Sequence, residues 1–226
     1  TNPWFNNTVF LTLSNKGYID FLNNTLMHFF QAVPGGRFFV VCYDQETFDW
    51  CNTFPRPGAL CVLSQGFGTY CKQAPDETKV YMEFYSNAFR ITQICRLAVI
   101  HYLLREGFNV FWLDPDSALI RNPFEVMPTG YEWVGACHPS DQKLMGPMRS
   151  KVHRNIGVMW IKTNIATKRA QRSLVLKMYY TREGRRAHDQ YIFNDVYTDQ
   201  RIKTYCIPFN IDGMSCNKDH WARHWE

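Results

Sequence analysis

The chain has 226 residues, which suits one large domain or two small ones. Its composition, 46% hydrophobic, 16% aromatic and 20% charged, excludes a disordered, collagen-like or coiled-coil chain. The net charge of +5 suits an anionic ligand or an acidic surface and is too small to indicate nucleic acid. The longest apolar stretch, residues 97–104, is far shorter than the roughly 20 residues of a membrane span.

The first 45 residues predict a βαβ unit. Residues 9–14 are rich in strand formers, residues 18–30 have an amphipathic helical pattern, and residues 38–43 repeat the strand pattern. A strand, a helix and a second strand in this order favour a parallel pair. Residues 42–71 hold four cysteines among prolines and glycines, and we expect a disulfide-rich loop there.

The second half of the chain continues the alternation of helices and strands. Residues 88–106 predict a helix that ends at Gly107, and residues 109–113 predict a buried strand that ends at Asp114-Pro115-Asp116. Further strands are expected at 133–137 and 156–163, and a helix at 165–180. We therefore predict a single α/β domain over residues 1–226, with a mostly parallel central sheet flanked by helices.

The eight cysteines and two glycosylation sequons bear on the cellular compartment. None of the cysteines has the C-x-x-C spacing of a zinc ribbon or redox site, and their pairing stays open. The sequons begin at Asn6 and Asn23. Together these features favour the lumen of the secretory pathway, although a reduced cytosolic protein with buried thiols is the alternative. A lumenal location would imply a targeting or anchoring segment trimmed from before Thr1.

Two aspartates after the buried strand are the main candidates for chemistry. Residues i and i+2 of an extended segment project to the same side, so Asp114 and Asp116 would place two carboxylates at the carboxyl end of the strand. Open α/β sheets bind ligands at that edge. Paired carboxylates suit Mg²⁺ or Mn²⁺. The alternative is that Asp116 caps a turn with Ser117 while Asp114 is solvated.

The segment Gly107 to Pro123 is similar to a known family. An apolar strand, D-x-D, a short strand and Arg-Asn-Pro resemble the nucleotide-diphospho-sugar transferase domain of retaining GT-A glycosyltransferases, particularly glycosyltransferase family 77. The likeness includes Asn155-x-Gly157 and His188-Asp189-Gln190, and it spans nearly the whole chain. The chain departs from the pattern at Pro115 and in residues 42–71. The resemblance implies a GT-A, Rossmann-like fold and a Golgi enzyme that uses a UDP-sugar.

This resemblance also implies roles for individual residues. Asp116 and Asp114 would bind Mn²⁺ or Mg²⁺, with Asp114 also near the ribose, and His220 or His224 would supply a third ligand. The diphosphate of the donor would lie on that cation, whose charge stabilises the leaving group. The loop after the first strand would contact the nucleotide, and Asp189 and Gln190 would be catalytic. The expected nucleotide contacts are Thr12, Leu13, Ser14, Asn15, Arg90, Arg96 and Asp114, and the expected donor-sugar contacts are Asn155, Gly157, Asp189 and Gln190.

Each of these residues has a structural alternative. Asp189 would cap a helix beginning near Tyr191, Asn155 and Gly157 would mark a turn and a bulge, and the two histidines would be solvated. Arginine suits diphosphate because its fork pairs two oxygens, but Arg90 and Arg96 also fit a solvated helix surface. The basic run 168–186 predicts a charged outer face, or a surface for an anionic acceptor or membrane head groups. Trp221 and Trp225 would stack on an acceptor sugar or pack in the core.

Three functions therefore compete. The first is transfer of a sugar, with retention implied by the resemblance, to a hydroxyl of a glycan or glycoprotein. The second is a catalytically inactive sugar-binding or scaffold domain of the same fold, against which the presence of Asp114, Asp116 and Asp189 argues. The third is an aspartate-nucleophile phosphatase, whose D-x-D normally opens its domain, whereas 113 residues precede Asp114 here. We predict the transferase, without nucleic acid as a partner.

Overall fold

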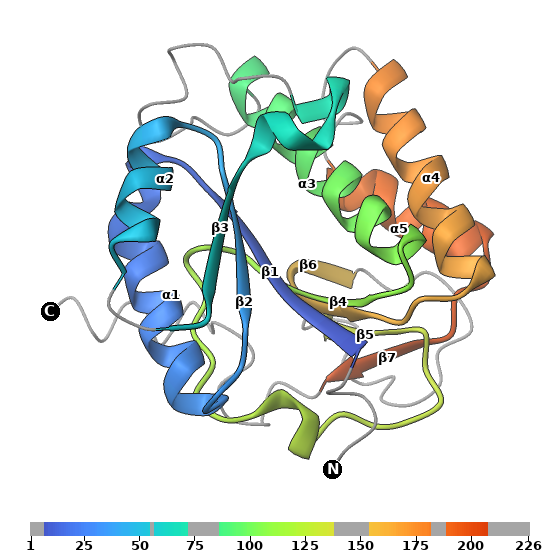
Figure 1. The fold of residues 1–226 in the computed structure, drawn as a ribbon. Coiled ribbons are helices and arrows are strands. Elements are labelled where there is room, and N and C mark those ends of the chain that lie inside the picture. Colours follow the sequence, from blue (N-terminus) through green and yellow to red (C-terminus); the bar gives the residue numbers. More distant parts are fainter. Residues whose placement is uncertain (1–6, 55–56, 72–85, 138–153, 182–188, 208–226) are drawn as a thin grey trace, which may run out of the picture.

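Strand β1 (Thr8–Ser14) lies inside a seven-stranded sheet in the computed structural model of the chain (Figure 1). The structure describes residues 7–54, 57–71, 86–137, 154–181 and 189–207. The strand order is β3-β2-β1-β4-β6-β5-β7. Parallel pairing joins β1 to β2 and β4, β2 to β3, and β5 to β7, whereas β6 runs antiparallel to β4 and β5. The other strands are β2 (Phe38–Cys42), β3 (Ala59–Leu63), β4 (Asn109–Leu113), β5 (Trp133–Cys137), β6 (Arg154–Ile161) and β7 (Thr204–Ile207).

Helices cover both faces of the sheet. Figure 1 shows α1 (Ile19–Ala32) and α2 (Gln45–Asn52) on one side, and α3 (Asn87–Arg105), α4 (Ile165–Tyr180) and α5 (Asp189–Asp199) on the other. Each strand contributes side chains to the core on both faces of the sheet, because successive side chains alternate between the two faces. In β4, Phe111 packs in the core under α1, whereas Val110 and Trp112 pack in the core under α3 and α4.

Local signals in the sequence account for the helix ends. Ser86 caps α3 by accepting a hydrogen bond from the Phe89 backbone N–H at 3.1 Å, and Asn164 with Thr167 forms a capping box at the start of α4. Gly107 follows α3 with a φ of 97°, a conformation that costs glycine little. The predicted βαβ unit, the helix before the D-x-D, and α4 are therefore confirmed.

The expectation of a disulfide-rich loop at 42–71 is wrong. This segment contains α2, which begins after the N-cap Asp44, and the edge strand β3. One disulfide, Cys51–Cys61, lies within the segment, whereas Cys71 pairs with Cys95 of α3. Cysteines and turn residues in this stretch obscured an ordinary helix and strand, whose parallel pairing with β2 extends the sheet.

The cysteines of the described residues form three disulfides. Besides the two already named, Cys137–Cys206 joins the neighbouring strands β5 and β7. Cys42 is a buried free thiol, and Cys216 lies outside the described residues. Disulfides on this scale are typical of proteins that fold in an oxidising compartment. None of the helices that the structure describes is both long and apolar enough to cross a bilayer.

Candidate active site

A cleft of about 440 Å³ opens at the carboxyl ends of β1 and β4, where the order of the parallel strands changes direction. Strand β1 leads into it through Leu13, Ser14 and Asn15, β4 ends in Asp114, and β6 supplies Asn155 and Gly157. The helices close the other side. Its lining also includes Tyr18, Phe21, Phe89, Thr92, Gln93, Arg96, Trp112, Pro115, Asp116, Ile156, Asp189, Gln190 and Tyr191.

The D-x-D lies in a turn and not in the extended segment that the sequence suggested. The Ser117 backbone N–H donates to the Asp114 carbonyl at 3.0 Å, which closes a turn over Pro115 and Asp116. Helix α1 supports this turn, because the buried Thr25 hydroxyl lies 2.6 Å from the carbonyl oxygens of both Pro115 and Ser117. Among residues 117–122 no short strand forms. Both aspartates still line the cleft, so the turn brings them to the same place.

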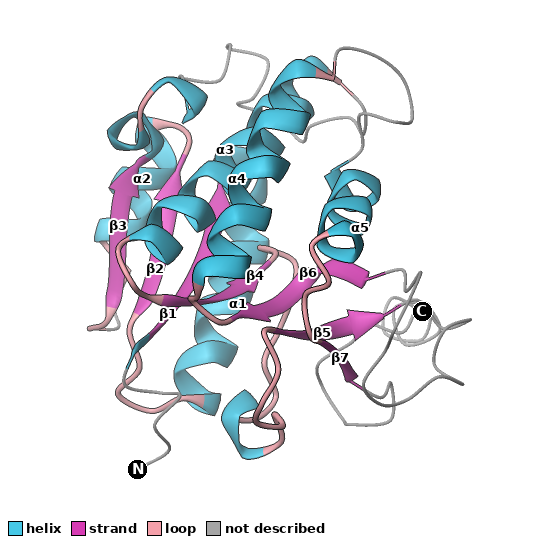
Figure 2. Cartoon of the chain, turned by 90° about the vertical axis from the view of Figure 1, so that its right-hand side faces the viewer, coloured by secondary structure: helices cyan, strands magenta, loops and turns pink. Residues whose placement is uncertain are grey.

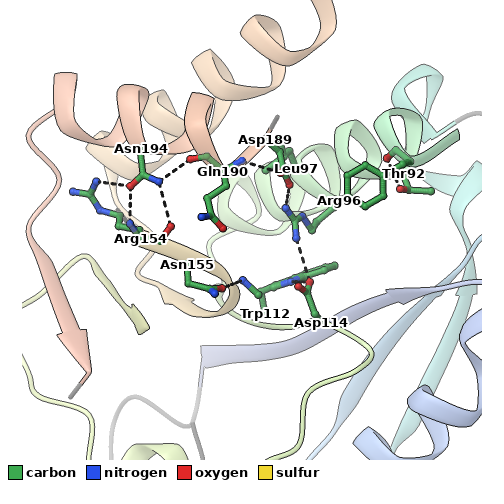
Figure 3. A network of polar contacts seen from close by, with 12 residues as sticks. Thr92, Arg96, Leu97, Trp112, Asp114, Arg154, Asn155, Asp189, Gln190 and Asn194 are labelled. Atoms are coloured by element: carbon green, nitrogen blue, oxygen red, sulfur yellow. Dashed lines mark hydrogen bonds and ion pairs between the residues drawn. The ribbon is translucent and has the colours of Figure 1, made fainter. Parts of the chain in front are cut away.

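The carboxylate of Asp114 is held from two sides. Trp112 Nε1 donates to Asp114 Oδ1 at 2.7 Å, and Arg96 Nη1 lies 3.2 Å from the same oxygen (Figure 3). Burial raises the pKa of Asp114 to about 6; the Arg96 guanidinium lowers it and the nearby Asp116 carboxylate raises it. Burial also raises the pKa of Asp116. The second Asp114 oxygen, Oδ2, faces Gly157, where a Cβ would lie 2.7 Å from it.

Arg96 joins the two sides of the cleft. Its guanidinium pairs with Asp114 and, through Nη2, with Asp189 Oδ2 of α5, and the Trp112 ring lies 5.2 Å below it (Figure 3). The Arg96 side chain is 6% exposed. Burial lowers the pKa of Arg96 and Asp114 raises it, and an arginine so paired stays charged. Arg96 is thus a buried, paired residue of the cleft wall and not a solvated surface residue.

Asp189 is the first residue of α5 and not the cap of a later helix. Its Oδ1 accepts from the Gln190 backbone N–H at 2.8 Å, while Oδ2 meets Arg96. The side chain is 3% exposed, and Gln190 and Tyr191 beside it line the cleft. The Asp189 carboxylate therefore lies in the cleft and contacts both the first turn of α5 and Arg96.

A second polar network joins α5 to β6 behind the cleft. Asn194 Nδ2 donates to the Gln190 carbonyl at 2.7 Å, and Asn194 Oδ1 accepts from the Arg154 backbone N–H at 2.7 Å (Figure 3). The buried Arg154 guanidinium donates to Thr204 Oγ1 and lies 5.9 Å from the Trp133 ring. Burial lowers the pKa of Arg154 to about 10. This network fixes Asn155 and Gln190 relative to each other.

Two expected nucleotide contacts lie elsewhere. Arg90 donates to the carbonyl oxygens of Met178, Tyr179 and Thr181, so it caps the carboxyl end of α4 and does not line the cleft. Thr12 is fully buried within β1 and also lies outside the lining. His220, His224, Trp221 and Trp225 lie outside the described residues. Among the described residues, no group of three His, Cys, Asp or Glu side chains is arranged around one point.

Sequence reasoning missed part of the lining. Thr92 and Gln93 lie on the cleft side of α3, which their spacing of four and three residues from Arg96 could have indicated. Trp112 precedes Asp114 by two residues and so shares its face of β4. Nothing in the sequence pattern singled out Arg154, and Asn194, which ends the Asp189-Gln190 block of the resemblance, was given no role.

Comparison with known proteins gives a family and a fold. The family described as nucleotide-diphospho-sugar transferase matches residues 36–226. The search of curated proteins finds no match. Among solved structures, the apo WbbM bifunctional glycosyltransferase superimposes with a TM-score of 0.59 at 13% identity, over 92% of this chain and 40% of that one. Mouse xyloside xylosyltransferase 1 in its apo form gives 0.55 at 11% identity, over 89% and 84%.

A third solved structure is that of the galactosyltransferase LgtC in complex with donor and acceptor sugar analogues, with a TM-score of 0.51 at 16% identity, over 88% of this chain and 72% of that one. At such identities the likeness shows the fold, which is the GT-A fold predicted from the sequence. This chain spans less than half the length of WbbM and of GlyE from Streptococcus pneumoniae, 40% and 49%.

Proposed function

The chain belongs to the nucleotide-diphospho-sugar transferase family, and from this membership we propose a metal-dependent transfer reaction. The donor is a UDP-sugar, the cation is Mn²⁺ or Mg²⁺, and the acceptor is a hydroxyl of a glycan or glycoprotein. Neither an inactive scaffold nor a phosphatase is needed to explain the site, because the carboxylates and the amides of one cleft all have roles in this reaction.

The observation that carries the metal dependence is the charge of the cleft. Its described lining holds three carboxylates, Asp114, Asp116 and Asp189, against the single guanidinium of Arg96. Arg96 is already paired with two of them. A nucleoside diphosphate is itself an anion, so it would be repelled by this lining. A divalent cation between the carboxylates and the diphosphate removes the repulsion.

The residues at the end of β4 fit such a cation. Asp114 Oδ2 faces Gly157 on the cleft side, and Asp116 extends from an exposed turn, so two hard oxygen donors are available. Mg²⁺ and Mn²⁺ accept few protein ligands and leave positions for water and phosphate oxygens. When bound, the cation would stabilise the charge that develops on the leaving diphosphate. His220 and His224 remain candidates for a third ligand.

We assign the other lining residues to contacts with either the nucleotide or the sugar of the donor. Ser14 and Asn15, at the end of β1, lie where a nucleotide would meet the sheet edge. Asp189 and Gln190 lie across the cleft and offer a carboxylate and an amide to the sugar hydroxyls. Arg96 holds the Asp189 carboxylate in place, which favours a precise orientation of the sugar. Asn155 adds an amide from β6.

Retention of the anomeric configuration accords with this arrangement. An inverting enzyme needs a general base that is free to take the acceptor proton. Two of the three carboxylates in the described lining, Asp114 and Asp189, are tied to Arg96. The lumen of the Golgi is the proposed location, supported by the three disulfides.

The proposed reaction is tested by release of the nucleoside diphosphate. The purified protein is incubated with UDP-glucose, UDP-galactose, UDP-xylose, GDP-mannose and related donors, each with Mn²⁺ or with EDTA. We expect one UDP-sugar to be consumed with Mn²⁺ and none with EDTA. Consumption that is unchanged by EDTA would contradict the metal dependence, and no consumption of any donor in the presence of an acceptor library would favour the inactive scaffold.

A further inference from the structure

Helices α3 and α4 pack side by side and carry only positive charge. Figure 1 and Figure 2 both show α3 and α4 next to each other on the same side of the sheet. Neither sequence contains an aspartate or a glutamate. Their basic residues are Arg90, Arg96 and Arg105 on α3, and Lys168, Arg169, Arg172 and Lys177 on α4. Arg96 is buried and paired with two aspartates, and Lys177 Nζ lies 3.9 Å from Asp199 Oδ2. The exposed Arg105, Arg169 and Arg172 make the outer surface of the two helices electropositive.

Basic side chains of the two helices meet along their junction. Lys168 Nζ lies 3.4 Å from the Arg105 carbonyl. Burial lowers the pKa of His101 on α3, and the charges of Arg105 and Arg172 lower it further. The carboxylate of Glu106, directly after α3, pairs with Arg105 at 3.3 Å and leaves both side chains largely exposed.

Aromatic rings extend the same junction toward the carboxyl end of α4. Tyr70 and Tyr179 meet edge to face at 5.4 Å, and Phe67 and Tyr102 at 5.7 Å. The Arg105 guanidinium lies 5.6 Å from the Tyr102 ring. Tyr102 is 44% exposed and Tyr179 is 52% exposed. We name this surface the α3–α4 strip, made of Phe67, Tyr70, His101, Tyr102, Arg105, Lys168, Arg172 and Tyr179.

The side chains of the strip fit an anionic carbohydrate better than a lipid surface. A membrane-binding helix inserts a continuous apolar face, whereas on α4 the exposed Ile165 and Leu176 are separated by Arg169 and Arg172. Tyrosine rings offer apolar faces with a polar tip, and arginine pairs two oxygens of a carboxylate or sulfate. The rings would stack on sugar units and the guanidinium groups would pair with acidic groups, so the strip suits a polymer of acidic sugars.

The strip also leads toward the donor cleft. Tyr179 lies beside the amino-terminal end of α3, because its carbonyl accepts a hydrogen bond from Arg90 at 3.3 Å. The neighbouring Phe89, Thr92 and Gln93 line the cleft. From Lys168 to Tyr179 the strip follows α4 for roughly 16 Å, enough for a few sugar units of an extended chain.

We propose that the α3–α4 strip binds an anionic polysaccharide, a polymer whose sugars carry carboxylate or sulfate groups, and holds it as acceptor beside the cleft. The binding itself needs neither donor nor cation. The role of the polymer as acceptor rests on the proposed transferase function. A binding measurement without nucleotide sugar therefore separates a failure of this proposal from a failure of the transferase assignment.

The test measures affinity of the whole protein for four probes in low salt. These are polygalacturonate, dextran sulfate, neutral dextran, and vesicles containing phosphatidylglycerol. We expect the affinity for at least one acidic polymer to exceed that for dextran by on the order of tenfold or more, and to weaken as salt is added. The two polymers distinguish carboxylate from sulfate recognition.

Variants place the binding on the strip. The double variant Arg105→Gln and Arg172→Gln removes two exposed charges, and we expect it to lose about tenfold in affinity for the acidic polymer. The matched control, Arg37→Gln with Arg121→Gln, removes two exposed arginines from outside the strip and should lose about twofold or less. Equal losses in both variants, equal affinity for dextran, or strip-dependent binding to vesicles alone would overturn the proposal.

Discussion

At the scale of single residues, the cleft depends on how tightly the Asp114 carboxylate is held. Trp112 and Arg96 fix Oδ1, and the missing side chain at Gly157 leaves room for Oδ2. The chain therefore needs glycine at 157 for the sake of Asp114, and not for its own backbone, which has no positive φ. The pairing of β6 with β5 is irregular between Arg154 and Met159, so the bulge considered from the sequence also falls in the stretch that contains this glycine.

Substitution of Gly157 by alanine tests this reading. The new Cβ would lie 2.7 Å from Asp114 Oδ2 and 3.1 Å from Asn155 Oδ1, so the carboxylate must leave its contacts. We expect Gly157→Ala to weaken Mn²⁺-dependent nucleotide binding by on the order of tenfold. Gly66→Ala is the matched control, because nothing lies within 4 Å of its Cβ. Calorimetry with both variants checks the result, and wild-type affinity in Gly157→Ala would refute it.

The charge of Asp189 has a separate test. Asp189→Asn keeps the shape of the side chain and removes the charge that faces Arg96 and the sugar. We expect kcat to fall by on the order of tenfold or more with a smaller change in KM for the donor. Asp195→Asn, exposed on the same helix, serves as control. Steady-state kinetics that are identical for Asp189→Asn and wild type would return Asp189 to a structural role.

At the scale of secondary-structure elements, the site needs two helices, α3 and α5, in addition to the ends of the strands. Helix α3 brings Arg96 over Asp114, and α5 begins at Asp189 so that its first turn faces the cleft. Asn194 then ties the first turn of α5 to the start of β6. The donor side of the cleft is thus built from contacts between residues that are far apart in the sequence.

Asn194→Asp tests whether the link between α5 and β6 matters for activity. The variant keeps an acceptor for the Arg154 N–H and replaces the amide that donates to the carbonyls of Gln190 and Arg154 by a carboxylate oxygen, which repels both. Loss of one such buried hydrogen bond costs about 1–3 kcal/mol. We expect kcat/KM to fall by on the order of tenfold, since Gln190 shifts relative to Asn155. Thr198→Val, which removes a contact to Arg154 at 3.3 Å without touching Gln190, should keep near-normal kinetics. A larger effect in Thr198→Val than in Asn194→Asp would contradict the reading.

The elements themselves could mostly be predicted from the sequence. Apolar periodicity marks α1, and periodicity together with capping residues marks α3 and α4. The resemblance brings Asp114, Asp116, Asn155 and Asp189 into one site, and all four line the cleft. Long-range contacts could not be predicted in this way. The periodicity of α3 does not tell which arginine meets a carboxylate, so the sequence predicts the same role for Arg90 and Arg96. In the structure Arg90 caps α4, whereas Arg96 pairs with two aspartates.

At the scale of the whole molecule, the three disulfides of the described residues cross-link elements that pack against each other. Cys137–Cys206 closes a separation of 69 residues between the last strands of the sheet. In the chain-entropy view, a loop of this length contributes about 4 kcal/mol. The described chain also buries one free thiol, Cys42, whose pKa burial raises to about 12, so it is protonated at neutral pH.

The disulfides and the buried Cys42 thiol each give a testable prediction. A reducing agent should lower the melting temperature by on the order of 10 °C. Without reductant, the native protein should leave Cys42 unreacted at pH 8, because the thiolate is the reactive form, and denaturant should expose it. Thiol titration with the Cys42→Ala variant as control checks this. Eight reactive thiols in denaturant without reductant would contradict both the disulfides and the lumenal location.

The central claim is that the negative cleft takes a nucleoside diphosphate only together with a divalent cation. The most direct measurement is the affinity of UDP, GDP and CMP for the wild type and for Asp116→Asn, each with Mn²⁺ and with EDTA. We predict that UDP binds the wild type with Mn²⁺, and that either EDTA or Asp116→Asn weakens this binding by on the order of a hundredfold. Equal affinity of the wild type for UDP in Mn²⁺ and in EDTA would contradict the claim.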